Sequence, residues 1–236
     1  MNKGKLFLLP TPISKEQNIM DILLPMYLDW IKSIEYFVVE TPKIARSFLK
    51  DLPLEKKIQD LHIESLDEHT QKEEIKELIT PLFSGNDMIL LSDAGVPTVA
   101  DPGYKLVSLA QKEGFKIVPL IGPSSILLAL MASGLNGQSF AFHGYLPKEK
   151  GLKRKRIKSL EKIAKNTGQT QIFMETPYKN QYMVEDILEV CEEASMLCIA
   201  QNIMSSNEYI VTKSIKEWRT ESIKLDKTPC LFLINT

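Results

Sequence analysis

The chain has 236 residues, of which 44% are hydrophobic, and carries a formal net charge of −1. This length and apolar content suffice for a large hydrophobic core, in one large domain or two smaller ones. A nearly neutral chain has no overall attraction for nucleic acid or anionic membranes, so contact with a polyanion must come from a local basic patch. The apolar stretch before Pro10 is too short for a signal peptide, and no run approaches a membrane span, so we expect a cytoplasmic protein.

Apolar runs and amphipathic stretches alternate along the first half of the chain. The apolar runs predict strands at residues 6–9, 36–39, 61–63, 88–91 and 116–120. The stretches between them predict helices at residues 19–31, 43–50, 71–83 and 105–113. This alternation is typical of βαβ units and predicts a mainly parallel sheet in an N-terminal α/β domain, residues 1–120.

The second half has a different pattern. A Gly-Pro turn at residues 122–123 precedes a helix expected at 126–132, followed by helices at 151–165 and 178–191. Strands are expected at 139–142, 170–174, 196–200, 208–211 and 230–234, and the last three have little helix between them. Consecutive strands favour antiparallel pairing, so residues 121–236 are expected to form a C-terminal α/β domain with a mixed sheet.

Four loops directly follow predicted strands, at residues 9–12, 92–104, 122–125 and 174–177. The loop Ser92–Tyr104 is the most informative, because Gly95 and Gly103 permit close backbone approach and Asp93 and Asp101 offer carboxylate acceptors. Open α/β sheets bind ligands at the carboxyl ends of their strands, so these loops predict a shared site. For Ser92–Tyr104 the alternative is an ordinary βα turn with an aspartate cap, and the other loops, taken singly, also fit common proline-rich turns or serine N-caps.

The sequence lacks several familiar chemical signatures. It contains no GxGxxG after a strand, no GxxxxGK[ST] and no GxSxG, so the usual dinucleotide, P-loop and serine-hydrolase sites are not supported. Its three histidines and three cysteines show no metal-ligand spacing, and we therefore expect no metal.

A local basic patch does occur. Residues 148–158 include seven basic side chains and one acidic side chain. Lysine and arginine contacts to phosphates provide sequence-independent affinity for nucleic acid. The segment predicts RNA binding, although a solvated helix face is the alternative. The candidate RNA-binding residues are Lys148, Lys150, Lys153, Arg154, Lys155 and Arg156.

The motifs Ser92-Asp-Ala-Gly-Val-Pro97, Asp101-Pro-Gly-Tyr104 and Val118-Pro-Leu-Ile-Gly-Pro-Ser-Ser125 resemble the ribosomal RNA small subunit methyltransferase I family. Phe140-Ala-Phe-His-Gly-Tyr-Leu-Pro147 and the basic run after it extend the resemblance over nearly the whole chain. That family belongs to the tetrapyrrole methylase superfamily. The resemblance implies the two-domain class III fold of methyltransferases that use S-adenosylmethionine, a cofactor cleft between the domains, and a homodimer.

The resemblance also implies particular site residues. The candidate cofactor-binding residues are Leu9, Pro10, Asp93, Gly95, Val96, Pro97, Ser124, Ser125, Met174, Ala200 and Pro229. Family members transfer the methyl group without a metal, so catalysis rests on positioning and on removal of a proton from the acceptor. Glu175 is the candidate base, because it is a carboxylate on one of the strand-end loops.

The chain departs from the family at several positions. The family's Glu-Asp-Thr-Arg appears as Glu40-Thr-Pro-Lys43, and its Ser-Pro-His-Arg appears as Thr176-Pro-Tyr-Lys179. We interpret these changes as a preserved methyl-donor site with an altered acceptor side. The leading hypothesis is methyl transfer to RNA or a ribosomal subunit, with a ribose 2′-hydroxyl as a candidate acceptor. The alternatives are a methylase of a tetrapyrrole or other small acceptor, a binding protein that retains the cofactor but not catalysis, and a structural α/β module.

Overall fold

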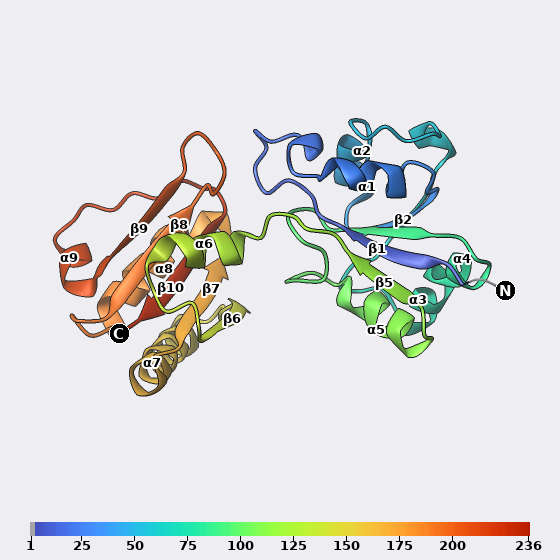
Figure 1. Cartoon of the computed structure of the whole chain (residues 1–236). Coiled ribbons are helices and arrows are strands. Elements are labelled where there is room, and N and C mark those ends of the chain that lie inside the picture. Colours follow the sequence, from blue (N-terminus) through green and yellow to red (C-terminus); the bar gives the residue numbers. More distant parts are fainter. Residues whose placement is uncertain (1–2) are drawn as a thin grey trace. The chain divides into compact units, whose positions relative to one another are not determined.

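The computed structural model describes residues 3–236 and divides into two compact units, of which unit 1 ends at Ser124 and unit 2 begins at Ser125 (Figure 1). The sequence places the division at 120/121, just before the Gly-Pro turn. Within the described residues, no helix is both long and apolar enough to cross a membrane.

Unit 1 is a parallel five-stranded sheet in the order β3-β2-β4-β1-β5. The strands are β1 (Lys5–Leu9), β2 (Tyr36–Val39), β3 (His62–Ser65), β4 (Met88–Leu91) and β5 (Lys116–Pro119). The helices are α1 (Pro25–Ile31), α2 (Pro42–Leu49), α3 (Lys72–Leu78), α4 (Thr80–Phe83) and α5 (Tyr104–Lys112), with short 3-10 helices η1 (Ile19–Asp21) and η2 (Ile58–Asp60). The predicted parallel sheet is confirmed.

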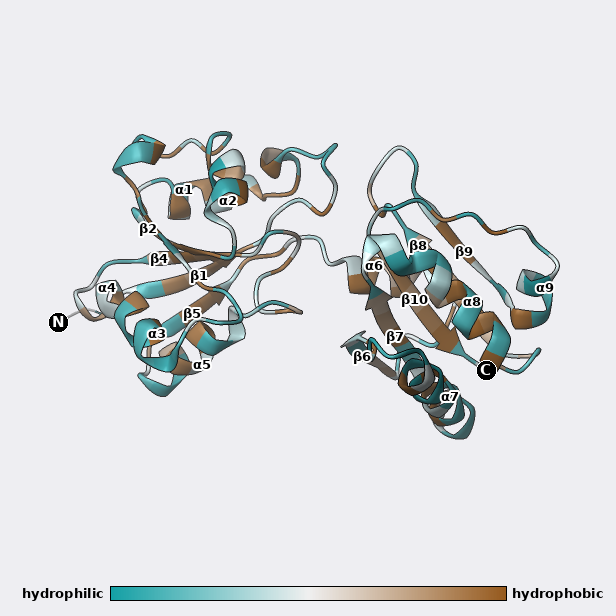
Figure 2. Cartoon of the chain, turned by 180° about the vertical axis from the view of Figure 1, so that it is seen from behind, coloured by the Kyte–Doolittle hydropathy of each residue, from teal (hydrophilic) through white to brown (hydrophobic). Residues whose placement is uncertain are grey.

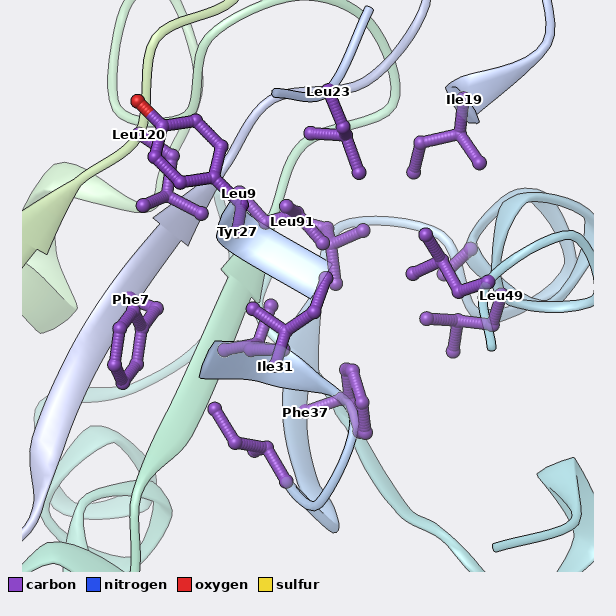
Figure 3. Packing of buried hydrophobic residues seen from close by; sticks show 14 of the residues in the cluster. Phe7, Leu9, Ile19, Leu23, Tyr27, Ile31, Phe37, Leu49, Leu91 and Leu120 are labelled. Atoms are coloured by element: carbon purple, nitrogen blue, oxygen red, sulfur yellow. The ribbon is translucent and has the colours of Figure 1, made fainter. Parts of the chain in front are cut away.

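Both faces of this sheet are buried, because successive strand residues point to opposite sides. Phe7, Ile89 and Leu91 face a cluster that includes side chains of α1 and α2, which Figure 3 shows from close by. Leu6 and Leu90 face the opposite cluster, to which α3, α4 and α5 contribute. A strand buried on both faces reads as an uninterrupted apolar run, which explains why Met88–Leu91 was recognisable in the sequence.

Unit 2 is a mixed five-stranded sheet in the order β6-β7-β10-β8-β9. The strands are β6 (Phe140–Tyr145), β7 (Thr170–Glu175), β8 (Met196–Gln201), β9 (Tyr209–Ser214) and β10 (Cys230–Asn235). Only β6 and β7 pair in parallel, and the other neighbours are antiparallel, which confirms the predicted mixed sheet. The helices are α6 (Ser125–Ser133), α7 (Lys150–Thr167), α8 (Asn180–Val190) and α9 (Ile215–Arg219), with the 3-10 helix η3 (Pro177–Lys179).

One face of the second sheet packs against α7, α8 and α9. Ile157 of α7, Met183 of α8 and Trp218 of α9 share a buried cluster with Phe173 and Phe232 of the sheet. Figure 2 shows the corresponding contrast in hydropathy, with β10 largely brown and much of α7 teal.

Proline explains why three predicted helices differ from the observed ones. The stretch 19–31 contains η1 and a separate α1 that begins at Pro25, and α4, with Pro81 near its start, follows α3 as a separate helix. Pro177 begins η3, so α8 starts only at Asn180. Proline lacks the backbone N–H of a helix interior and fits the first turn instead. Helix α9 was not predicted; it has only five residues and begins with a Ser214–Glu217 capping box.

Candidate functional site

The carboxyl ends of all five strands of unit 1 lie at one edge of its sheet, because the strands are parallel. Strands β1 and β4 are neighbours in the middle of the sheet. The chain leaves β1 toward β2, in one direction across the sheet, and leaves β4 toward β5, in the opposite direction. The carboxyl edge between β1 and β4 is therefore the topological switch point, where open α/β sheets bind ligands.

The loops after β1 and β4 are joined at this edge by a two-hydrogen-bond bridge. The Thr11 N–H donates to the Gly95 carbonyl at 2.9 Å, and the Gly95 N–H donates to the Thr11 carbonyl at 3.1 Å. The Thr11 hydroxyl also donates to the Ser92 carbonyl at 3.2 Å. Gly95 has φ of +78°, a conformation that favours glycine. The bridge brings the predicted residues Leu9, Pro10 and Gly95 together.

The loop after β5 packs directly on the loop after β1. A Cβ atom on Gly122 would lie 2.1 Å from the Cβ of Pro10, so only glycine fits this approach. The Ile121 N–H donates to the Tyr27 hydroxyl at 3.2 Å, which fixes the start of the same loop. Ser124 ends this loop and unit 1, and Ser125 begins α6 of unit 2.

Asp93 is held by the segment that follows β2. Its Oδ1 accepts from the Thr41 N–H at 3.0 Å, and its Oδ2 accepts from the Thr41 hydroxyl at 2.7 Å. The Asp93 N–H donates to Oε2 of Glu40 at 3.4 Å. Burial raises the pKa of Glu40, and the charges of Asp93 and Asp101 raise it further, against the lowering effect of the Asp93 N–H. The loop therefore concentrates negative charge.

The rest of the loop after β4 has an unusual backbone. Thr98 and Ala100 have φ of +73° and +65°, which is uncommon for residues with a side chain. The Asp101 carboxylate stabilises this turn by accepting from the Thr98 N–H at 2.8 Å and the Gly103 N–H at 2.6 Å. Burial raises the pKa of Asp101. The predicted residues Val96 and Pro97 precede this strained turn, with Pro97 buried.

In unit 2, three of the predicted cofactor-binding residues lie at one end of the sheet. Met174 of β7 and Ala200 of β8 both lie opposite Leu231 of β10, one on each side. Pro229 immediately precedes β10, and its carbonyl accepts from the Asn202 N–H at 3.3 Å. The sheet register therefore groups Met174, Ala200 and Pro229.

Glu175, the candidate base, is held by close contacts. Its Oε1 accepts from the Thr176 N–H at 2.7 Å and the Thr176 hydroxyl at 3.1 Å. Its Oε2 lies 3.8 Å from Nζ of Lys153, and the Glu175 side chain is only 12% exposed. The carboxylate is therefore oriented by its neighbours.

The predicted basic segment is divided between two environments. Lys153 is 7% exposed and forms an ion pair with Asp186 at 3.1 Å, and Arg154 binds the same carboxylate at 2.7 Å. Arg154 also pairs with Glu189. The remaining predicted residues are half-buried Arg156, which lies near His143, and the exposed lysines Lys148, Lys150 and Lys155.

Comparison with a family model decides the family. Residues 28–218 match the model described as Tetrapyrrole (Corrin/Porphyrin) Methylases, which covers most of the chain. The chain belongs to the tetrapyrrole methylase family. As a member of this family it is a methyltransferase, which confirms the predicted enzyme class.

Individual relatives agree with the family assignment. The chain is 30% identical to "Ribosomal RNA small subunit methyltransferase I" of Vibrio cholerae, over 98% of this chain and 76% of that protein. A protein of the same name from Halalkalibacterium halodurans is 34% identical over 79% of this chain, and the match spans 60% of that protein.

Solved structures of methyltransferases share the fold. The methyltransferase CobJ superimposes with a TM-score of 0.62 at 16% identity, covering 100% of this chain and 95% of that chain. The uroporphyrin-III-C-methyltransferase from Thermus thermophilus has a TM-score of 0.56 at 16% identity, covering 98% and 92% of the two chains. The two-unit α/β fold is therefore that of tetrapyrrole methylases.

Sequence reasoning missed several residues of this methylase's strand-end loops. Thr11 bridges the loops, and Thr41 fixes Asp93, but neither was among the predicted site residues. A signal existed for Thr11, because a threonine between two prolines directly after a buried strand has few ways to satisfy its hydroxyl. Thr41 had no such signal, since its partner lies 52 residues away in the chain.

Proposed function

We propose that this methyltransferase uses S-adenosylmethionine and methylates RNA of the small ribosomal subunit. Binding of the methyl donor is supported by the bridge between Thr11 and Gly95 at the switch point of unit 1. The acceptor half rests on the relatives, which are named as ribosomal RNA methyltransferases. The exposed lysines of residues 148–158 support the same acceptor.

The loops of unit 1 fit the proposed cofactor. A Cβ on Gly95 would lie 3.2 Å from both Ile13 Cγ2 and the Pro123 carbonyl oxygen, so the close packing of these loops favours glycine here. Each Asp93 oxygen accepts one hydrogen bond from Thr41 and retains capacity for another, which suits a ligand ammonium or hydroxyl group. S-adenosylmethionine supplies an electrophilic methyl group on a sulfonium, which needs no metal for its transfer.

The cofactor-binding roles of Met174, Ala200, Pro229 and Ser125 in unit 2 remain predictions. We also retain Glu175 as the proposed base for an acceptor hydroxyl, which must lose its proton as it gains the methyl group. The contacts with Thr176 orient this carboxylate. Glu175→Gln should lower kcat and leave the dissociation constant for S-adenosylmethionine unchanged.

Calorimetry of cofactor binding tests the donor half. Asp93→Asn keeps the size of the side chain and removes its charge, so the dissociation constant for S-adenosylmethionine should rise about tenfold or more. Asp87→Asn is a matched control, because Asp87 precedes β4 at the opposite end of the strand. If both substitutions raised the dissociation constant equally, or if neither raised it, a donor site at the Asp93 loop would be contradicted.

Transfer of radiolabelled methyl groups tests the acceptor half. Small ribosomal subunits from a strain that lacks the gene should accept label in their RNA. Alanine at Lys148, Lys150 and Lys155 should raise KM for the subunit, whereas alanine at three exposed lysines of unit 1 should not. The control lysines are Lys50, Lys57 and Lys112. Label in a small-molecule fraction would instead support a tetrapyrrole or similar acceptor, and tight cofactor binding without any transfer would support a non-catalytic binding protein.

Two further properties belong to the same proposal. We propose that the chain is a homodimer and acts in the cytoplasm, where ribosomal subunits are found. Light scattering of the pure protein and fractionation of cells that express it would test both.

A further inference from the structure

Two tyrosines at the start of α8 are unusually exposed. Tyr178 in η3 is 77% exposed, and Tyr182 in the first turn of α8 is 63% exposed. They follow β7 directly, only a few residues beyond Glu175. A single exposed aromatic ring is ordinary, but two rings in one short segment leave a large apolar surface in water.

The backbone between these tyrosines is fastened to the rest of unit 2. Asn180 is 1% exposed, and its Nδ2 donates to the Thr228 carbonyl at 2.7 Å. Gln181 donates through Nε2 to the Ile223 carbonyl at 3.2 Å, and its Oε1 accepts from the Leu225 N–H at 3.3 Å. The two inward-facing amides therefore join the start of α8 to residues 223–228 and hold the tyrosines on the outside.

A lysine lies over one of the two rings. Nζ of Lys227 lies 5.7 Å from the centre of the Tyr178 ring, within the range of a cation–π contact. The two fastened segments, residues 178–182 and 223–229, carry three lysines and one acidic residue, all of them exposed. The lysines are Lys179, Lys224 and Lys227, and the acidic residue is Asp226.

We propose that Tyr178, Tyr182 and Lys227, here called the tyrosine platform, bind unpaired nucleobases of an RNA. The rings provide stacking surfaces for bases, and the lysines attract the phosphates between them. Bases in a duplex are stacked on each other and present no free face, so the platform selects single-stranded segments. The inference rests on the proposed RNA acceptor and adds to it residues that lie outside the basic segment 148–158.

Fluorescence anisotropy with a labelled single-stranded RNA decamer tests the platform on the full chain. Base–aromatic stacking is worth enough that Tyr178→Ala and Tyr182→Ala should each raise the dissociation constant at least about fivefold. Tyr178→Phe and Tyr182→Phe keep the ring and should stay within about twofold of the unmodified protein. Binding of the same decamer as a duplex should change little in any variant.

The charge of Lys227 has its own readout. A lysine that neutralises one phosphate of a single strand contributes about 0.7 to the slope of log affinity against log salt concentration. Lys227→Gln should therefore reduce that slope by about this amount. Because the substituted side chains are exposed, thermal unfolding of every variant should match that of the unmodified protein.

The outcomes separate the platform from the proposed function. Unchanged affinity in both alanine variants would overturn the platform, even if the protein methylates ribosomal RNA. Conversely, if the protein transfers no methyl group to RNA but the alanine variants still lose affinity, the platform stands and the proposed function fails. A change of oligomeric state in light scattering, with unchanged RNA affinity, would assign the tyrosines to contact between copies and would also overturn the platform.

Discussion

Gly122→Ala should disturb the packing between two strand-end loops of unit 1, residues 9–12 and 122–125, that we propose to bind the methyl donor. The added Cβ would lie 2.1 Å from Cβ and 2.3 Å from Cγ of Pro10, whereas ordinary van der Waals contact begins near 3.4 Å. The loop after β5 and the loop after β1 must therefore separate by about 1 Å or more. Pro10 cannot yield by rotating a flexible side chain, because its ring is part of the backbone.

The expected magnitude follows from this displacement. Overpacking of this kind costs about 1–3 kcal/mol of unfolding free energy. In a domain of this size, each kcal/mol lowers Tm by roughly 4 °C. A shift of about 1 Å in groups that position a substrate lowers the rate about 100-fold. We therefore expect a moderate loss of stability together with a much larger loss of methyl transfer.

Calorimetric unfolding of the full chain measures the loss of stability. A methyl-transfer assay measures the loss of rate, and titration with S-adenosylmethionine shows whether cofactor affinity falls with it. Gly137→Ala is the matched control, because a Cβ at Gly137 would meet no atom within 4 Å. If Gly122→Ala bound the cofactor and unfolded like Gly137→Ala, the close packing of the two loops would not matter to the site. A loss of Tm with unchanged affinity would confine the effect to folding and refute the proposed role of these loops in cofactor binding.

Three other substitutions or treatments test the electrostatics of the two units. Burial raises the pKa of Glu40, because it makes ionisation less favourable in the folded state than in the unfolded state. The free energy of unfolding should therefore fall as the pH rises through that pKa. Glu40→Gln should reduce this fall, which urea unfolding at pH 4 and pH 7 measures. Lys153→Met removes one of the two cations that contact Asp186 and leaves Arg154 in place. It should cost about 1–3 kcal/mol, against less than about 0.5 for Lys155→Met, in the same urea experiment. Burial raises the pKa of every cysteine thiol, so a thiol reagent at pH 8 should react only after the protein is unfolded; immediate reaction of the native protein would contradict this. The thiols are those of Cys191, Cys198 and Cys230.

The strands were predictable because burial dictates their composition. Met88–Leu91 is buried on both faces and is therefore apolar at every position. Residues 19–31 illustrate the opposite case, since their apolar spacing continues through Pro25 although a helix cannot. The spacing of apolar residues indicates which side chains face the core, but it does not indicate where the helical hydrogen bonds are interrupted.

The basic segment shows what charge counting misses. Lys153 lies in register with Ile157 and Leu160, the inward positions of α7, so its spacing alone indicated burial. Its partner Asp186 lies on α8, and the pairing depends on how the two helices pack against the sheet. That non-local packing is not encoded in any short motif, so a sequence can identify the inward lysine but not the carboxylate that it meets.

The two departures from the family pattern lie in different parts of the fold, so we interpret them differently. The sequence assigned both Glu40–Lys43 and Thr176–Lys179 to the acceptor side. In the structure, Thr41 donates to Asp93 at 3.0 and 2.7 Å, so the first departure contacts a loop that we propose to bind the methyl donor. An aspartate at position 41, as in the ribosomal family's Glu-Asp-Thr-Arg, would bring a second carboxylate to Asp93, and like charges at this distance repel strongly when partly buried. Threonine removes that repulsion and supplies a donor. The first departure therefore changes how the loop of Asp93 is held. The second carries Tyr178, and under our proposal of the tyrosine platform it is the departure that would bear on the acceptor.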